Sequence, residues 1–171
     1  MTQFITFRLA DSMPQSVLET WRNDLNTGAI TDAGLRKRIE IYLDQNCGEC
    51  WLSDERIADL VQNALLHLDG KKYRLIAWVI MPNHVHFLIQ THTGFTLAEI
   101  MQSIKSYTAH EANKLLGRKG HFWLKEYFDR YIRDGRHYGA TVRYIEENPV
   151  KARLCKKPED WKFSSAYFRQ R

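Results

Sequence analysis

Short apolar runs rich in β-branched and aromatic residues predict four strands. Three of them are Phe4 to Leu9 (FITFRL), Tyr73 to Met81 (YRLIAWVIM) and His84 to Gln90 (HVHFLIQ). Pro82-Asn83 separates the second from the third and predicts a tight turn there. A fourth strand is expected within Phe128 to Arg133.

Apolar residues at helical spacing predict four helices, at residues 35–43, 53–68, 96–116 and 138–147. A loop around Pro14 is expected before the first of them. Ser53 and Thr96 are the expected N-caps of the second and third helices. The expected helix ends are Asp69-Gly70, Gly117 and Pro149, and the expected inward-facing residues of the third helix are Leu97, Ile100, Met101, Ile104, Ala112 and Leu115.

The resulting order, β-α-α-β-β-α-β-α, predicts an α+β fold. It is close to a ferredoxin-like αβ sandwich with a central antiparallel sheet and extra helices. The chain has 171 residues, no internal repeat and no Pro/Gly-rich linker, so one domain over residues 1–171 is expected.

His84-Val85-His86 is the first candidate for chemistry. Side chains alternate between the faces of a strand, so the two imidazoles are expected on one face and Val85 in the core. Two imidazoles on one face are able to hold one divalent ion. The pattern is weak evidence alone, but the turn before it and the apolar strands around it favour a metal-ligating role.

Tyr144 and Asn148 are the second candidate, because residues four apart share a helical face. Periodicity alone favours a packing role for Tyr144 and a helix-ending role for Asn148. Beside a metal-binding histidine pair, however, a tyrosine is able to act as a nucleophile on a phosphate. The two features together indicate phosphoryl-transfer chemistry.

Charge is unevenly distributed along the chain. Residues 105–171 contain 16 Lys and Arg against 8 Asp and Glu, whereas residues 1–104 contain 9 against 12. A basic C-terminal part is consistent with a polyanionic partner and equally with a solvated basic surface.

Composition excludes several other classes. No apolar run is long enough for a membrane span, and no secretory signal is recognisable at Met1, so a cytoplasmic, nucleoid-associated protein is expected. Three cysteines do not suit a disulfide framework. Cys47 and Cys50 form a CxxC without a second pair or a thioredoxin-like context, so we expect them to be free thiols without a metal.

Several motifs together resemble the REP-associated tyrosine transposases, a group within the HUH nucleases. They are Met-Pro-Asn-His-Val-His at 81–86, Tyr-Ile-Glu-Glu-Asn-Pro-Val-Lys-Ala at 144–152 and Asp-Trp-Lys-Phe-Ser-Ser-Ala at 160–166. Gly-His-Phe-Trp at 120–123 and Glu-Tyr-Phe-Asp-Arg at 126–130 fit the same family. The resemblance extends from about residue 73 to 168, whereas residues 35–70 match only loosely.

This resemblance implies a role for each motif residue. His84, His86 and Asn148 would hold Mg²⁺ or Mn²⁺, and Tyr144 would attack the scissile phosphate of single-stranded DNA. The products would be a 5′-phosphotyrosine and a free 3′-hydroxyl. Tyr107 is a rival nucleophile, because His110 and Glu111 share its helical face; the closer motif match favours Tyr144.

The implied partner is single-stranded DNA with palindromic, REP-like hairpins, and a monomer is favoured over a homodimer. Residues 150–171 are expected to form a DNA-contacting tail. A binding protein on the same scaffold without enzymatic activity is the main alternative function, and a phosphoesterase that uses water is another. The expected DNA contacts are Lys105, Lys114, Arg118, Lys119, Lys125, Arg130, Arg133, Arg136, Arg143, Lys151, Trp123 and Trp161, with Phe122 as a further stacking candidate. A core position is the alternative for the Phe122-Trp123 pair and the more common one for such a pair near a turn.

Overall fold

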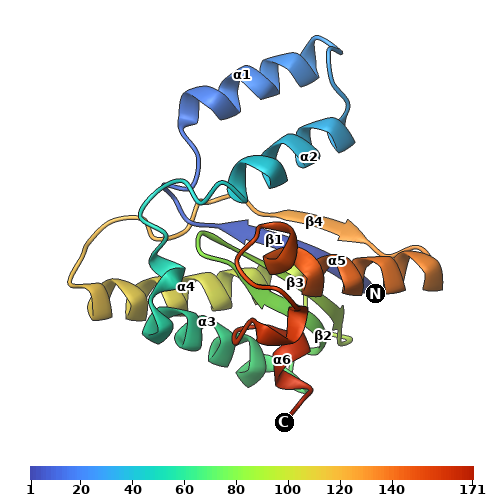
Figure 1. Ribbon diagram of the computed structural model, residues 1–171. Helices are drawn as coiled ribbons and strands as arrows, with labels where there is room; N and C mark the ends of the chain where they lie inside the picture. The colour runs from blue at the N-terminus through green and yellow to red at the C-terminus, as the bar shows by residue number, and fades with distance from the viewer.

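The computed structural model describes residues 1–171 and has a four-stranded antiparallel sheet at its centre (Figure 1). The strand order is β2-β3-β1-β4, which is the ferredoxin-like arrangement predicted for this chain. The elements are β1 (Thr2–Arg8), α1 (Gln15–Asn26), α2 (Asp32–Leu43), η1 (Trp51–Ser53), α3 (Glu55–Leu68), β2 (Tyr73–Ile80), β3 (His84–Thr91), α4 (Leu97–Leu116), β4 (Phe128–Tyr131), α5 (Gly135–Lys151), η2 (Pro158–Asp160) and α6 (Ser165–Phe168).

The two faces of the sheet carry different layers. Helices α3 and α4 cover one face and enclose the main apolar core, to which β1 contributes Ile5 and Phe7. On the opposite face α5 packs Ile145 against Phe4 and Leu88 in a smaller core. Alternation along β1 therefore sends its odd-numbered residues to the α3–α4 side and its even-numbered residues to the α5 side.

A helix occupies part of the segment predicted as a loop. Helix α1 follows Pro14 and forms a helical hairpin with α2, which projects from the rest of the molecule in Figure 1. Leu18 is the one fully buried residue of α1, and it packs in a separate cluster with Leu35, Ile39 and Leu43. Leu18, Trp21 and Leu25 recur at helical spacing, so the sequence does contain a signal for this helix, which the prediction of a loop around Pro14 overlooked.

The ends of α3 and α4 follow from capping chemistry. Thr96 forms the predicted cap of α4, reinforced by Glu99 in a reciprocal capping box, and Gly117 ends the helix in the left-handed conformation. The cap of α3 is Asp54, whose carboxylate accepts from the Arg56 amide, so the prediction of Ser53 was wrong by one residue. Leu115, predicted to face inward, is largely exposed.

Helix α5 continues beyond the proline that was expected to end it. It runs through Pro149 to Lys151, so the predicted end was wrong. Proline removes one N–H donor without preventing the next turn, and Ala152 N still donates to Asn148 O at 3.0 Å. Asn148 therefore keeps helical geometry, one turn after Tyr144.

The C-terminal segment is packed along β2. Ile80 N donates to Phe163 O at 2.9 Å, and Trp78 N donates to Ser165 Oγ at 3.2 Å. Ser165 Oγ also donates to a Glu146 carboxylate oxygen of α5 at 2.7 Å. The segment thus covers the outer edge of the sheet. None of the helices is both long and apolar enough to cross a membrane.

Candidate active site

The two histidines of β3 lie on the α5 face of the sheet, opposite Thr6 and Arg8 of β1. The register pairs Thr6 with His86 and Arg8 with His84. Both imidazoles are 1% exposed, and Val85 between them is in the core on the other face, as alternation predicted. The ring centroids of the two histidines are 4.7 Å apart.

Each imidazole is held by a hydrogen bond at Nδ1. His86 Nδ1 lies 2.6 Å from Thr6 Oγ1, and His84 Nδ1 lies 2.7 Å from Asn83 Oδ1. Asn83 Nδ2 donates to Cys47 O at 3.2 Å, which leaves the Oδ1 atom to accept from His84. The proton of His84 is therefore on Nδ1, and the lone pair on Nε2 is free.

The site keeps both histidines neutral. Burial lowers the pKa of His86 to about 3. Burial also lowers the pKa of His84 well below its usual value, and the charges of His86 and Arg8 add to this effect. Neutral imidazole is the form that binds a metal ion.

Helix α5 brings Tyr144 and Asn148 to the histidines. The Tyr144 ring centroid is 5.5 Å from that of His86 and 5.8 Å from that of Phe4. Asn148 is 2% exposed, and its Oδ1 atom has no hydrogen-bond partner; the same is true of His84 Nε2. Two buried, unpaired lone pairs are costly unless a ligand satisfies them, so this donor set fits a divalent cation.

A cavity of about 350 Å³ opens beside Tyr144, between α2 and the sheet. Phe4, Thr6 and Phe128 line it from the strands, and Arg130 lies over the Phe4 ring at 5.9 Å. The Tyr144 phenol faces α2 across this space.

Helix α2 adds residues that were not predicted as part of the site. Arg36, Lys37 and Glu40 line the cavity opposite Tyr144. Burial, followed by the negative charge of Glu40 and a hydrogen bond to it, raises the pKa of Tyr144. Burial likewise raises the pKa of Glu40. Helical spacing located α2 itself, but the sequence contains no signal that it lies across a cavity from Tyr144.

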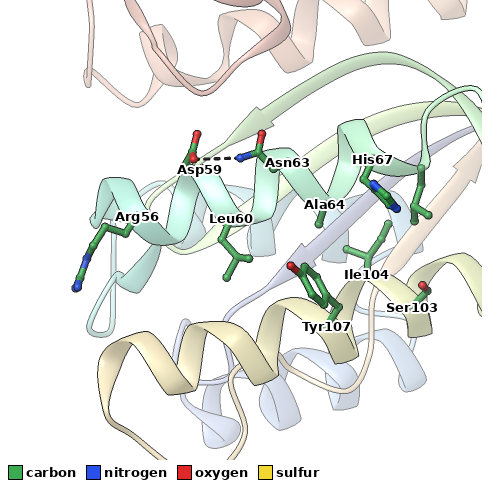
Figure 2. A pocket seen from close by; sticks show the side chains of 10 residues that line it. Arg56, Asp59, Leu60, Asn63, Ala64, His67, Ser103, Ile104 and Tyr107 are labelled. Atoms are coloured by element: carbon green, nitrogen blue, oxygen red, sulfur yellow. Dashed lines mark hydrogen bonds between the residues drawn. The ribbon is translucent and has the colours of Figure 1, made fainter.

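Tyr107, the rival nucleophile, lies on the opposite side of the sheet. It projects from α4 toward α3 and lines a groove with Leu60 and His67 (Figure 2). Its side chain is exposed, and its neighbour His110 pairs with Glu111. The structure therefore does not bring Tyr107 to His84 and His86.

The predicted stacking residues Phe122 and Trp123 belong to the core. They are 1% and 5% exposed, and Trp123 Nε1 donates to Thr108 Oγ1 at 2.9 Å. Their interpretation as exposed stacking platforms was wrong, and the alternative of a core position is confirmed, because the Phe-Trp pair packs in the main core behind β1. Trp161 is half-buried, and its Nε1 donates to Ile80 O at 2.9 Å.

The predicted DNA-contacting cations differ in their surroundings. Lys105 Nζ donates to Leu124 O and Lys125 O at 2.6 and 2.7 Å, so its ammonium anchors a loop. Arg118 stacks on Trp51 at 3.9 Å. Lys151 lies 5.3 Å over the Tyr144 ring and is therefore close to the site, as is Arg130. The exposed remainder are Lys114, Lys119, Lys125, Arg133, Arg136 and Arg143.

The CxxC segment supports the site from outside. Cys47 and Cys50 form no disulfide, and the Cys50 thiol donates to Asn46 O at 3.2 Å. The Cys47 carbonyl accepts from Asn83, the residue that fixes His84. The contribution of this segment to the site therefore comes from its backbone.

Comparison with known proteins gives a consistent assignment. Residues 51–148 match the family described as "Transposase IS200 like". A REP-associated tyrosine transposase of Escherichia coli K12 is 29% identical over 96 residues, covering 56% of this chain and 55% of that protein. The chain thus spans about half the length of this curated relative.

The fold agrees with that of a solved REP-associated tyrosine transposase bound to a REP hairpin, with a TM-score of 0.61. The two are 20% identical, and the match covers 98% of this chain and 77% of that one. The family match includes both histidines, Tyr144 and Asn148, and it begins after the α1–α2 hairpin. Because this match extends over more than half of the chain, the protein belongs to the IS200-like transposase family.

Proposed function

We propose that this protein is a metal-dependent endonuclease and strand transferase of single-stranded DNA, with Tyr144 as its nucleophile. One observation carries the proposal: a tyrosine, two neutral histidines and a buried amide from separate elements converge at one site. Two of the converging atoms, His84 Nε2 and Asn148 Oδ1, have no partner within the protein.

His84, His86 and Asn148 are the proposed ligands of Mg²⁺ or Mn²⁺. A divalent ion bound there would withdraw charge from the phosphate oxygens and favour the phenolate form of tyrosine. Thr6 and Asn83 keep the two imidazoles in the orientation and tautomer that leave Nε2 available. The buried position of the site excludes water that would compete with the tyrosine.

The proposed reaction is a transesterification. The Tyr144 oxygen forms a bond to phosphorus, and the bond from phosphorus to the 3′ oxygen breaks. The products are a 5′-phosphotyrosine and a 3′-hydroxyl, and reversal with another 3′-hydroxyl joins strands. Because the pKa of Tyr144 is raised, its proton needs an acceptor, and we assign that role to Glu40 across the cavity.

The proposed substrate carries REP-like hairpins. A solved protein of the same fold is bound to a REP hairpin, and the Escherichia coli relative is named for these elements. Arg36, Lys37, Arg130 and Lys151 surround the Tyr144 cavity and would bind backbone phosphates. A monomeric, cytoplasmic protein remains our expectation.

A denaturing-gel assay tests this proposal. Labelled hairpin oligonucleotides from repeats of the host genome are incubated with protein and Mn²⁺. We expect a slow-migrating covalent adduct with the unaltered protein and with Tyr107→Phe, and none with Tyr144→Phe or with the double variant His84→Ala/His86→Ala.

Three other outcomes would contradict the proposal in different ways. An adduct that survives Tyr144→Phe but not Tyr107→Phe would identify the other tyrosine as the nucleophile. Strand cleavage without any adduct would indicate a phosphoesterase that uses water. Hairpin binding without cleavage in any metal would leave a binding protein on the transposase scaffold.

A further inference from the structure

Arg8 is a buried cation beside the candidate metal ligands. It is 2% exposed and lies on the same face of β1 as Thr6. Leu9 N donates to Asn83 O at 2.9 Å, so Arg8 and His84 form a non-hydrogen-bonded antiparallel pair. The Cα atoms of such pairs are about 4.5 Å apart and their side chains are close neighbours. Arg8 therefore extends from the position next to His84.

No acidic side chain pairs with this guanidinium. Both terminal nitrogens of Arg8 are buried without a hydrogen-bond partner. The guanidinium carbon, Cζ, lies 5.4 Å from the centroid of the Phe128 ring. The nearby carboxylate of Glu126 is paired with Arg22 instead. Burial lowers the pKa of Arg8 to about 10, so it remains charged at neutral pH.

A buried, unpaired charge is unfavourable unless a counter-ion binds it. The cavity beside Tyr144 lies next to Arg8. Thr6 and Phe128 line that cavity; Thr6 is on the same face of β1 as Arg8, and the Phe128 ring lies under the guanidinium. Guanidinium presents planar N–H donors that match the spacing of phosphate oxygens. An anionic phosphate is thus the ligand class that this position fits.

We propose that Arg8 binds one backbone phosphate of the DNA strand, at or next to the phosphate that Tyr144 attacks. This inference rests on the proposed function and adds a substrate-binding residue to it. Arg8 and His84 are cross-strand neighbours, so a phosphate held by the unpaired Arg8 guanidinium would lie beside the proposed metal ligands. Arg8 would then orient the phosphate for in-line attack.

The test measures binding without catalysis. Affinity for a hairpin-bearing single-stranded oligonucleotide is measured in EDTA, with methylphosphonate replacing one phosphate at a time. For the unaltered protein we expect about a tenfold loss at the position that Arg8 contacts, since hydrogen bonds to charged groups are strong. In Arg8→Gln, methylphosphonate at that position should no longer change the affinity. The salt dependence of binding should also weaken by the equivalent of about one phosphate contact.

Arg74→Gln is the matched control, because Arg74 is an exposed arginine of β2 in the same sheet. It should retain the position-specific loss. If circular dichroism shows that Arg8→Gln does not fold, Arg8→Lys replaces it, and the loss at the same position should shrink because lysine cannot bind bidentately.

An unchanged methylphosphonate profile in the folded Arg8 variant overturns the inference. The outcome is separable from that of the adduct assay. If the protein forms the covalent adduct but its methylphosphonate profile does not depend on Arg8, only the role of Arg8 is refuted. If the profile depends on Arg8 but no adduct forms, only the proposed catalysis is refuted.

Discussion

The hydrogen bond between Thr6 and His86 is expected to contribute both to stability and to the affinity of the site for a metal ion. Thr6→Val replaces the hydroxyl with a methyl group of similar size and removes the 2.6 Å contact to His86 Nδ1. Thr6 is 7% exposed and His86 1%, so water cannot easily replace the lost partner. Leaving a buried polar atom unpaired costs about 1–3 kcal/mol. For a chain of this length that corresponds to a Tm lower by about 2–12 °C.

The larger expected effect of Thr6→Val is on the metal. Loss of an outer partner that orients a ligating histidine typically weakens metal affinity about 10- to 100-fold. Titration calorimetry with Mn²⁺ measures this affinity directly, without DNA. Thr6→Ser, which keeps the hydroxyl, should restore most of the affinity.

Thr108→Val is the control for a purely structural effect. Thr108 is buried on the other face of the sheet, where its hydroxyl accepts from Trp123 Nε1 at 2.9 Å. The substitution should lower Tm by a similar amount and leave Mn²⁺ affinity unchanged. Equal Mn²⁺ affinity of Thr6→Val and the unaltered protein would refute the assignment of His86 as a ligand oriented by Thr6.

Three further predictions concern the surroundings of Tyr144. Glu40→Gln should slow adduct formation about 100-fold at neutral pH. The difference in rate from the unaltered protein should become smaller at high pH, where hydroxide in the solvent removes the phenol proton. An unchanged pH–rate profile would exclude Glu40 as the proton acceptor. Burial raises the pKa of Asp44 to about 6, so the ionised Asp44 carboxylate destabilises the fold above that pH. The destabilisation is lost below about pH 4, the pKa of an aspartate in the unfolded chain, because Asp44 is then protonated in both states. Asp44→Asn should therefore raise Tm at pH 7 by about 3 °C, after allowance for partial exposure, and not at pH 4; an equal rise at both would contradict this. Lys151→Ala should reduce the salt dependence of single-strand binding by about one phosphate contact, measured by fluorescence anisotropy, and an unchanged slope would place Lys151 outside the interface.

Much of the fold was predictable because strong local patterns specify it. Alternation along His84 to Gln90 located β3 and the shared face of the two histidines, and the motif spacing identified Tyr144 and Asn148. Helix α1 was missed although Leu18, Trp21 and Leu25 share one of its faces, because the segment around Pro14 was interpreted as a loop rather than as the start of a helix. Pro149 misled the prediction of the helix end, since tertiary packing of α5 outweighs the loss of one hydrogen bond.

The site residues that were not predicted are distant in sequence from the motifs. Glu40 and Arg8 contribute through the packing of α2 over the sheet and through cross-strand register, and neither residue belongs to a motif. Trp123 shows the opposite error, because an aromatic residue near basic residues is compatible with stacking on DNA until its core position is known. Local pattern thus pointed to the residues that converge at the candidate site but not to those that surround them.

The burial of the candidate site bears on the form of DNA that the proposed reaction would use. His84, His86 and Asn148 are at most 2% exposed, and the cavity beside the half-buried Tyr144 has a volume of about 350 Å³. That volume is near the lower end of the range for small-molecule sites, roughly 300–1,000 Å³. A paired duplex holds its phosphates on the outside of a wide, stiff helix, whereas a single strand is able to extend one nucleotide into such a cavity. For the proposed reaction, the geometry therefore favours a single-stranded segment at the phosphate that Tyr144 would attack, and a hairpin would bind outside the cavity.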